Sequence, residues 1–121
     1  MKLDINQANS VAEVAKPWGR ELILAANELY SGKILLFNKG CRTSLQYHED
    51  KDETFYLYSG KIVVEIEGKN ISPSHNEAIR IRPHVVHRIT AIESSVVLEV
   101  STPHNGTVRL EDDYGRQNSS G

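Results

Sequence analysis

The sequence predicts a single all-β domain in which two antiparallel sheets close on one shared core. Turn-forming residues recur at short intervals, and runs of about five to eight residues rich in Val, Ile, Leu, Tyr and Phe lie between them. Several of these runs alternate apolar and polar residues, as strands with one buried face do. A chain of 121 residues is long enough for one compact core and too short for two.

The alternation is clearest in three runs, which are residues 61–67, 78–82 and 96–102. In the last of them, Val96, Leu98 and Val100 lie on one face of the predicted strand. Glu99 and Ser101 lie on the other face. This pattern implies that the apolar faces pack against the core.

The two ends of the chain are polar and carry weaker signals. Ser10 to Glu13 fits a capping box, which predicts a short helical turn over residues 10–16. Trp18 is interpreted as a packing anchor for the incoming chain. We therefore divide the chain into an N-terminal arm, a barrel and a flexible tail, which are residues 1–15, 16–116 and 117–121.

Composition limits the class of partner. A net charge of −2 provides no basic field for nucleic acid or an anionic membrane. The single Cys41 excludes an intrachain disulfide and a cysteine-based zinc site. The N-terminus does not resemble a signal peptide, and no apolar run approaches the roughly 20 residues that span a bilayer. We expect a cytoplasmic protein that binds neither nucleic acid nor membrane.

One window of the sequence predicts a metal site. Gln46 and His48 are two residues apart, so on a strand they point to the same face. A turn over residues 49–52 can fold the next strand back, which brings Glu53 beside them. His87 is the best-placed fourth ligand from a distant strand. Two imidazoles, a carboxylate and an amide oxygen suit one divalent metal, namely zinc, iron(II), manganese or nickel.

The same window resembles the first cupin motif in every spacing, as Gly40-x5-Gln46-x-His48-x4-Glu53-x6-Gly60. Gln46 stands where that motif has its first histidine. The second motif is matched at His87 and departs at the three surrounding positions, which are Pro83, His84 and Ala91. The resemblance implies a cupin fold, a double-stranded β-helix or jelly-roll barrel.

Three further strings resemble the type II phosphomannose isomerase domain of bifunctional mannose-1-phosphate guanylyltransferase/mannose-6-phosphate isomerases. They are Lys16-Pro-Trp-Gly-Arg-Glu, Ser44-Leu-Gln-Tyr-His and Val108-Arg-Leu-Glu-Asp-Asp-Tyr-Gly-Arg116. Phosphomannose isomerases of this family use a Gln-x-His pair with a later Glu and His on the metal. The resemblance implies a zinc-dependent isomerase that interconverts mannose 6-phosphate and fructose 6-phosphate through an enediol. The sequence contains no nucleotidyltransferase domain, so we expect a stand-alone version.

Such a reaction needs a base and a cationic group for the phosphate. The resemblance favours Arg109 among the arginines of the chain. Glu99, on the polar face of a late strand, is a candidate base, and Lys51 and His104 are the other two.

Alternatives remain open at this point. Two histidines and a carboxylate also suit an iron(II) oxygenase, and a cupin can be a non-enzymatic sugar-binding or regulatory module. His75, His84 and His104 are interpreted as structural. Residues 49–52 are interpreted as a solvated turn in which Asp50 is near enough to approach the metal. Outward-facing Tyr56 and Tyr58 predict a homodimer interface.

Overall fold

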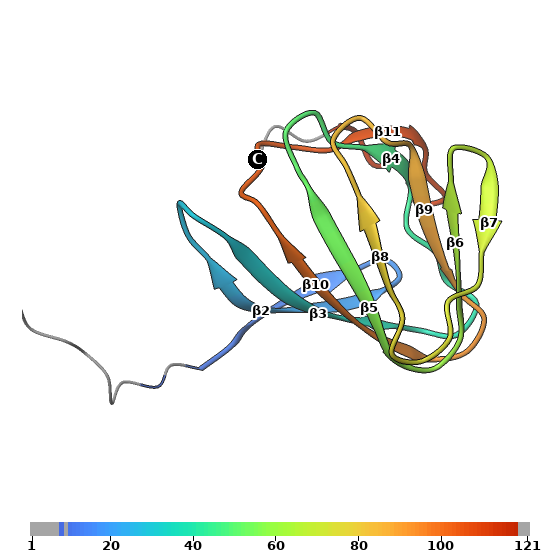
Figure 1. The fold of residues 1–121 in the computed structure, drawn as a ribbon, viewed down its shortest axis with the longest axis horizontal. Helices are drawn as coiled ribbons and strands as arrows, with labels where there is room; N and C mark the ends of the chain where they lie inside the picture. Colours follow the sequence, from blue (N-terminus) through green and yellow to red (C-terminus); the bar gives the residue numbers. More distant parts are fainter. Residues whose placement is uncertain (1–7, 9, 119–121) are drawn as a thin grey trace, which may run out of the picture.

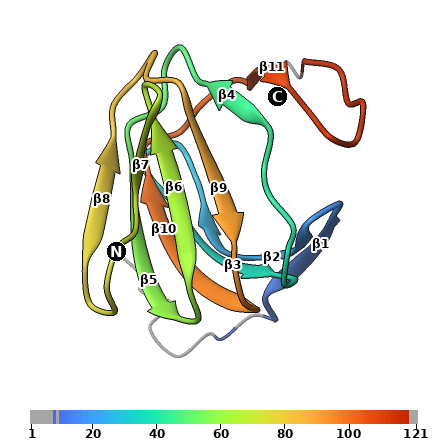
Figure 2. The same cartoon turned by 90° about the vertical axis from the view of Figure 1, so that its right-hand side faces the viewer.

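The computed structural model describes residues 8 and 10–118, which form two antiparallel sheets that face each other (Figures 1 and 2). The first sheet has the order β1 (Ala12–Lys16), β2 (Gly19–Ala26), β3 (Ser31–Phe37), β10 (Ser95–Ser101), β5 (Glu53–Ser59) and β8 (Ala78–Ile81). The second has the order β11 (Val108–Glu111), β4 (Leu45–Tyr47), β9 (His87–Ala91), β6 (Ile62–Ile66) and β7 (Lys69–Ile71). The all-β prediction is confirmed.

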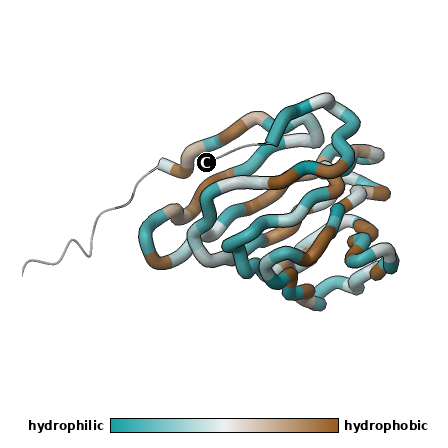
Figure 3. Tube along the Cα trace, turned by 90° about the horizontal axis from the view of Figure 1, so that it is seen from above, coloured by the Kyte–Doolittle hydropathy of each residue, from teal (hydrophilic) through white to brown (hydrophobic). Residues whose placement is uncertain are grey.

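The apolar core lies between the sheets and follows the alternation of the strands. Hydrophobic and hydrophilic residues alternate along much of the trace (Figure 3), and Ile62 and Val64 are buried as predicted. Trp18 is 4% exposed and stacks on Phe37, with ring centroids 4.3 Å apart. Because Trp18 lies in the turn between β1 and β2, this stacking fixes the hairpin onto the core.

The face of β10 that points inward is the opposite of the one that its alternating apolar residues predict. Val97, Glu99 and Ser101 point inward and are buried, whereas Val96 is half-buried and Val100 is 61% exposed. The reason is that β10 lines a polar cavity between the sheets, where Glu99 is held by other charged groups. Val96, Leu98 and Val100 therefore lie on the outer face of the six-stranded sheet.

The predicted helical turn over residues 10–16 is wrong, because Ala12–Lys16 forms β1. This strand pairs with β2 from Ala12↔Ile23 to Lys16↔Gly19. Gly19 permits the close approach of β2 to β3, since a Cβ there would lie 1.9 Å from the carbonyl oxygen of Leu36. Part of the expected N-terminal arm thus belongs to the sheet.

Arm residues 1–7 and 9 and tail residues 119–121 lie outside the described residues. No described helix is long and apolar enough to cross a membrane. The cytoplasmic location stays a prediction.

Candidate metal centre and active site

A cavity of about 600 Å³ lies between the two sheets. The predicted metal ligands, the first candidate base and the favoured arginine all line this cavity: Gln46, His48, Glu53, His87, Glu99 and Arg109. They come from five strands and the chain next to them, so the fold assembles the group from distant parts of the sequence. The roles assigned to them stay predictions.

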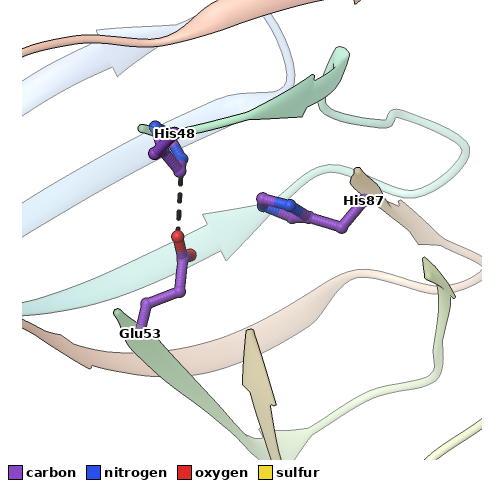
Figure 4. A group of neighbouring side chains, drawn as sticks. All are labelled: His48, Glu53 and His87. Carbon is purple, nitrogen blue, oxygen red and sulfur yellow. Dashed lines mark ion pairs between the residues drawn. The ribbon is translucent and has the colours of Figure 1, made fainter. Parts of the chain in front are cut away.

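Three of these side chains converge on one point (Figure 4). His48 directly follows β4, Glu53 begins β5 and His87 begins β9. One nitrogen or carboxylate oxygen from each lies within 4.8 Å of the others, and all three residues are buried. The short turn before β5 brings Glu53 back to His48, and the pairing of Gln46 with His87 aligns β4 with β9.

The donor atoms of this cluster fit a divalent metal ion. Nδ1 of His48 lies 3.0 Å from the carbonyl oxygen of Gly106, and Nδ1 of His87 lies 2.9 Å from that of Val85. Each ring therefore donates its Nδ1–H and keeps the lone pair of Nε2 directed into the cavity. Both Nε2 atoms and Oε2 of Glu53 are buried without a hydrogen-bond partner among the described residues. A cation would satisfy all three atoms.

Burial sets the protonation of the cluster. It lowers the pKa of His48 to about 4, with the charge of Lys51 acting in the same direction. Burial also lowers the pKa of His87. Both imidazoles are therefore neutral near pH 7, which is the form that binds metals.

The carboxyl group of Glu53 is shifted the other way. Burial raises its pKa to about 8, and the charge of Glu99 adds to the effect while Lys51 opposes it. A bound metal ion would stabilise the ionised carboxylate and reverse this shift, because its charge exceeds that of any neighbouring group.

Gln46 lies on the cavity wall beside the cluster. Its Oε1 accepts a hydrogen bond of 2.6 Å from Oγ of Ser44, which is completely buried. An amide oxygen has two lone pairs, so this hydrogen bond leaves one for another partner. Gln46 can therefore still serve as the fourth ligand.

Lys51 lines the cavity, and the sequence interpretation had offered it both as a candidate base and as part of a solvated turn. The turn over residues 49–52 was expected to be solvated, but Lys51 is only 5% exposed. Its Nζ lies 3.1 Å from Oε2 of Glu99 and 3.7 Å from Oε2 of Glu53. The signal was the spacing: Lys51 is two residues before Glu53, so an extended chain directs both side chains inward.

Glu99 and Arg109 approach the cavity from opposite sheets. Glu99 lies in β10 opposite Lys33 of β3 on one side and Phe55 of β5 on the other. Arg109 of β11 lies opposite Gln46 of β4. Nη1 of Arg109 donates to the carbonyl oxygen of Gln117, at 2.6 Å, within the predicted flexible tail. Four other arginines of the chain do not line the cavity: Arg42, Arg80, Arg82 and Arg88.

The remaining histidines divide between the cavity and the surface. His104, interpreted as structural, lines the cavity with its ring centroid 5.3 Å from that of His48. His75 lies outside it, with Nε2 3.0 Å from the carbonyl oxygen of Gly60. Asp50 is also outside the cavity lining and accepts a hydrogen bond from the backbone of Asn105.

The barrel and its buried cluster of two histidines and a carboxylate define a cupin. The chain belongs to the family described as mannose-6-phosphate isomerase C-terminal, which matches residues 4–119. This confirms the resemblance to the type II phosphomannose isomerase domain.

Individual relatives agree with this assignment. The chain is 28% identical to the alginate biosynthesis protein AlgA of Pseudomonas aeruginosa, over 92% of this chain and 24% of that protein. It is 29% identical to the mannose-1-phosphate guanylyltransferase ManC of Salmonella typhimurium, over 86% of this chain and 23% of that protein. The chain thus spans about a quarter of these relatives. KdgF from Halomonas sp. superposes with a TM-score of 0.71 at 26% identity, over 83% of this chain and 91% of that one.

Proposed function

We propose that the protein is a metal-dependent isomerase of phosphorylated hexoses that interconverts mannose 6-phosphate and fructose 6-phosphate. The observation that carries this proposal is the convergence of His48, Glu53 and His87 within 4.8 Å in a cavity that also contains Glu99. The family description supports the substrate class. A cavity of about 600 Å³ is large enough for a hexose phosphate.

His48, Glu53 and His87 would hold the metal, with Gln46 as fourth ligand. We assign zinc, because two imidazoles with oxygen ligands are a common catalytic zinc set. The ion would supply Lewis-acid polarisation of the sugar carbonyl. The protein holds the ligands in place through the carbonyl groups that accept the Nδ1–H hydrogen bonds.

Glu99 is the proposed base. Burial tends to raise the pKa of this carboxyl group, but Lys51 and Lys33 prevail and hold the pKa below its usual value. Glu99 is therefore ionised near pH 7 and able to accept a proton. In the forward direction it would remove the proton from C2 of the open-chain aldose and return a proton to C1.

Arg109 is the proposed binding group for the negative charge of the substrate. Its buried Nε has no hydrogen-bond partner among the described residues. Guanidinium groups bind phosphate through paired N–H donors, so this free donor is suited to a phosphate oxygen.

The test is a coupled assay for fructose 6-phosphate formed from mannose 6-phosphate, with protein that was first stripped of metal and then loaded with zinc. We expect turnover with the zinc-loaded protein and none with the stripped protein. The matched control is the zinc-loaded His48→Ala variant. Metal binding without turnover of either sugar phosphate would contradict the proposal and favour a non-enzymatic sugar-binding module.

One observation favours a second candidate. Two histidines and one carboxylate are the ligand set of iron(II) oxygenases. If the zinc-loaded protein is inactive, anaerobic loading with iron(II) and measurement of oxygen consumption with sugar substrates tests this candidate.

We also propose that the chain forms a homodimer through the outer face of the six-stranded sheet. Val100 and Tyr58 are 61% and 65% exposed on neighbouring strands of this face, and Leu24 is 55% exposed on β2. A second copy of the chain would cover these side chains.

A further inference from the structure

The cavity contains a second group of charged side chains that the metal ligands and the base do not explain. We call it the cationic group, and its members are Lys16, Lys33, Arg109 and Arg116. Lys16 ends β1 and Lys33 lies in β3, whereas the two arginines come from the C-terminal part of the chain. The fold therefore brings residues about 100 positions apart into the lining of one cavity.

Local structure directs Lys16 toward the cavity. The β1–β2 hairpin is fixed by the stacking of Trp18 on Phe37, and Lys16 pairs with Gly19 at its closed end. Lys16 begins the string Lys16-Pro-Trp-Gly-Arg-Glu, whose pattern by itself indicates no function for the lysine. Its place on the cavity wall suggests a role beyond packing.

The charges of the cavity lining do not cancel. Its cationic side chains outnumber its carboxylates, since Lys51 joins the cationic group and the carboxylates are Glu21, Glu53 and Glu99. Outside the lining, Asp112 forms a two-pronged ion pair with Arg116 and neutralises it. The balance is still positive before any metal binds, although the whole chain has a net charge of −2.

The excess charge is concentrated on Lys16 and Arg109. Glu21 is shared, with its Oε1 4.0 Å from Nζ of Lys16 and 3.5 Å from Nζ of Lys33. Arg109 makes no ion pair with a described carboxylate, and its Nε is buried without a hydrogen-bond partner. A buried donor left in this state costs free energy unless a ligand accepts from it.

Repulsion within the cationic group supports the same conclusion. Burial lowers the pKa of Lys16, and the charges of Lys33, Arg116 and Arg109 lower it further against the opposing effect of Glu21. Like charges held together in a cavity are stabilised by an anion between them.

We infer that Lys16, Lys33 and Arg109 form an anion subsite that holds the charged group of the sugar substrate while its carbonyl end reaches the His48–Glu53–His87 cluster. The inference rests on the proposed function, which it deepens by assigning the phosphate to residues of β1 and β3 as well as to Arg109. A phosphate monoester has about −1.5 to −2 charge at pH 7, which suits the positive excess. A sugar carboxylate presents the same oxyanion chemistry with less charge.

The test measures binding rather than turnover. Inorganic phosphate is titrated by calorimetry into metal-free protein, first as wild type and then as Lys16→Gln and Arg109→Gln. The matched control is Lys69→Gln, because Lys69 is exposed on β7 and does not line the cavity. We expect each cavity variant to weaken phosphate binding about tenfold or more, since each removes a charge-assisted contact, and the control to leave it unchanged.

Equal phosphate affinity in wild type and in both cavity variants would overturn the inference. A wild-type protein that binds neither phosphate nor a hexuronate would also overturn it. Competition by mannose 6-phosphate but not by a hexuronate identifies a phosphate subsite. The opposite result supports the anion subsite but assigns it to a carboxylate. Phosphate binding through Lys16 in a protein without isomerase activity supports this inference and contradicts the proposed function, so the two fail separately.

Discussion

Nζ of Lys51 lies 3.1 Å from Oε2 of Glu99, and both side chains are almost fully buried. The same ammonium group lies 3.7 Å from Oε2 of Glu53. Lys51 thus places one positive charge between two buried carboxylates, one of which belongs to the metal cluster. Its charge holds the pKa of Glu99 low against burial and opposes the rise in the pKa of Glu53.

Replacement of Lys51 by methionine should therefore destabilise the metal-free protein. Removal of one partner from a buried ion pair typically costs about 3 kcal/mol or more, because the remaining charge is left uncompensated. We expect zinc to restore part of the loss, since the ion neutralises Glu53. Urea unfolding with and without zinc measures both effects, with exposed Lys39→Met as control. Equal stability of Lys51→Met and wild type would contradict the assigned role.

Glu53→Gln should change the pH dependence of stability. The folded-state pKa of Glu53 is raised to about 8 from 4.5, so the folded state binds more protons than the unfolded state between these values. The free energy of unfolding therefore falls as pH rises through this window, because the unfolded state releases the proton of Glu53 more readily than the folded state does. We expect metal-free Glu53→Gln to be more stable than wild type by about 4 kcal/mol at pH 8, with little difference at pH 4.5. Unfolding curves across this range test the sign.

Zinc should abolish the higher stability of Glu53→Gln at pH 8. The ion binds an ionised carboxylate more strongly than an amide, so it stabilises the wild type more than the variant. If zinc stabilises wild type and Glu53→Gln to the same extent, Glu53 is not a metal ligand.

His48→Ala and His87→Ala should each lose metal. Each substitution removes a neutral Nε2 donor that the backbone hydrogen bond on Nδ1 directs into the cavity. Mutation of a residue that only hydrogen-bonds to a metal ligand typically lowers metal affinity by roughly 10–100-fold. We expect a larger loss of zinc affinity here, because each substitution removes a ligand itself. Competition with a zinc chelator measures it, and His75→Ala is the control because His75 lies outside the cavity. Loss of zinc in the His75 variant as well would indicate a general effect on the fold.

Glu99→Gln should reduce kcat without removing the metal. The amide retains the shape of the side chain and cannot accept the C2 proton, so we expect a decrease of about 10² to 10⁴ in kcat. Elemental analysis of the same sample provides the control, with an unchanged ratio of zinc to protein. Full activity with bound zinc would show that another group is the base, and His104 and Lys51 would be tested next.

Val100→Lys should separate the proposed dimer. Val100 is 61% exposed on the outer face, so a lysine there adds charge to the interface without disturbing the core. We expect sedimentation velocity to give a dimer for wild type and a monomer for Val100→Lys, with unchanged circular dichroism. A monomeric wild type would contradict the interface.

The all-β class, the strand-rich middle of the chain and the grouping of Gln46, His48 and Glu53 followed from sequence patterns. Turn spacing and alternation identified β5 and β6, and the spacing of these three residues predicted that they lie together, as they do in the cavity lining. Local rules suffice for these features, because a residue's face on a strand depends only on its parity. The same rules misread residues 10–16, where pairing with β2 overrides a local helical signal.

The sequence by itself determined which residues share a face, and the tertiary structure decided which face is inside. In β10 the inward face is the one with Glu99, because the cavity supplies Lys51 as a partner for its buried charge. Lys16 became a site residue, and Lys51 a buried ion-pair partner of Glu99, only through packing against chain segments distant in sequence. Burial of a charge depends on the groups that surround it in space, and those groups are brought together only by the packing of the two sheets.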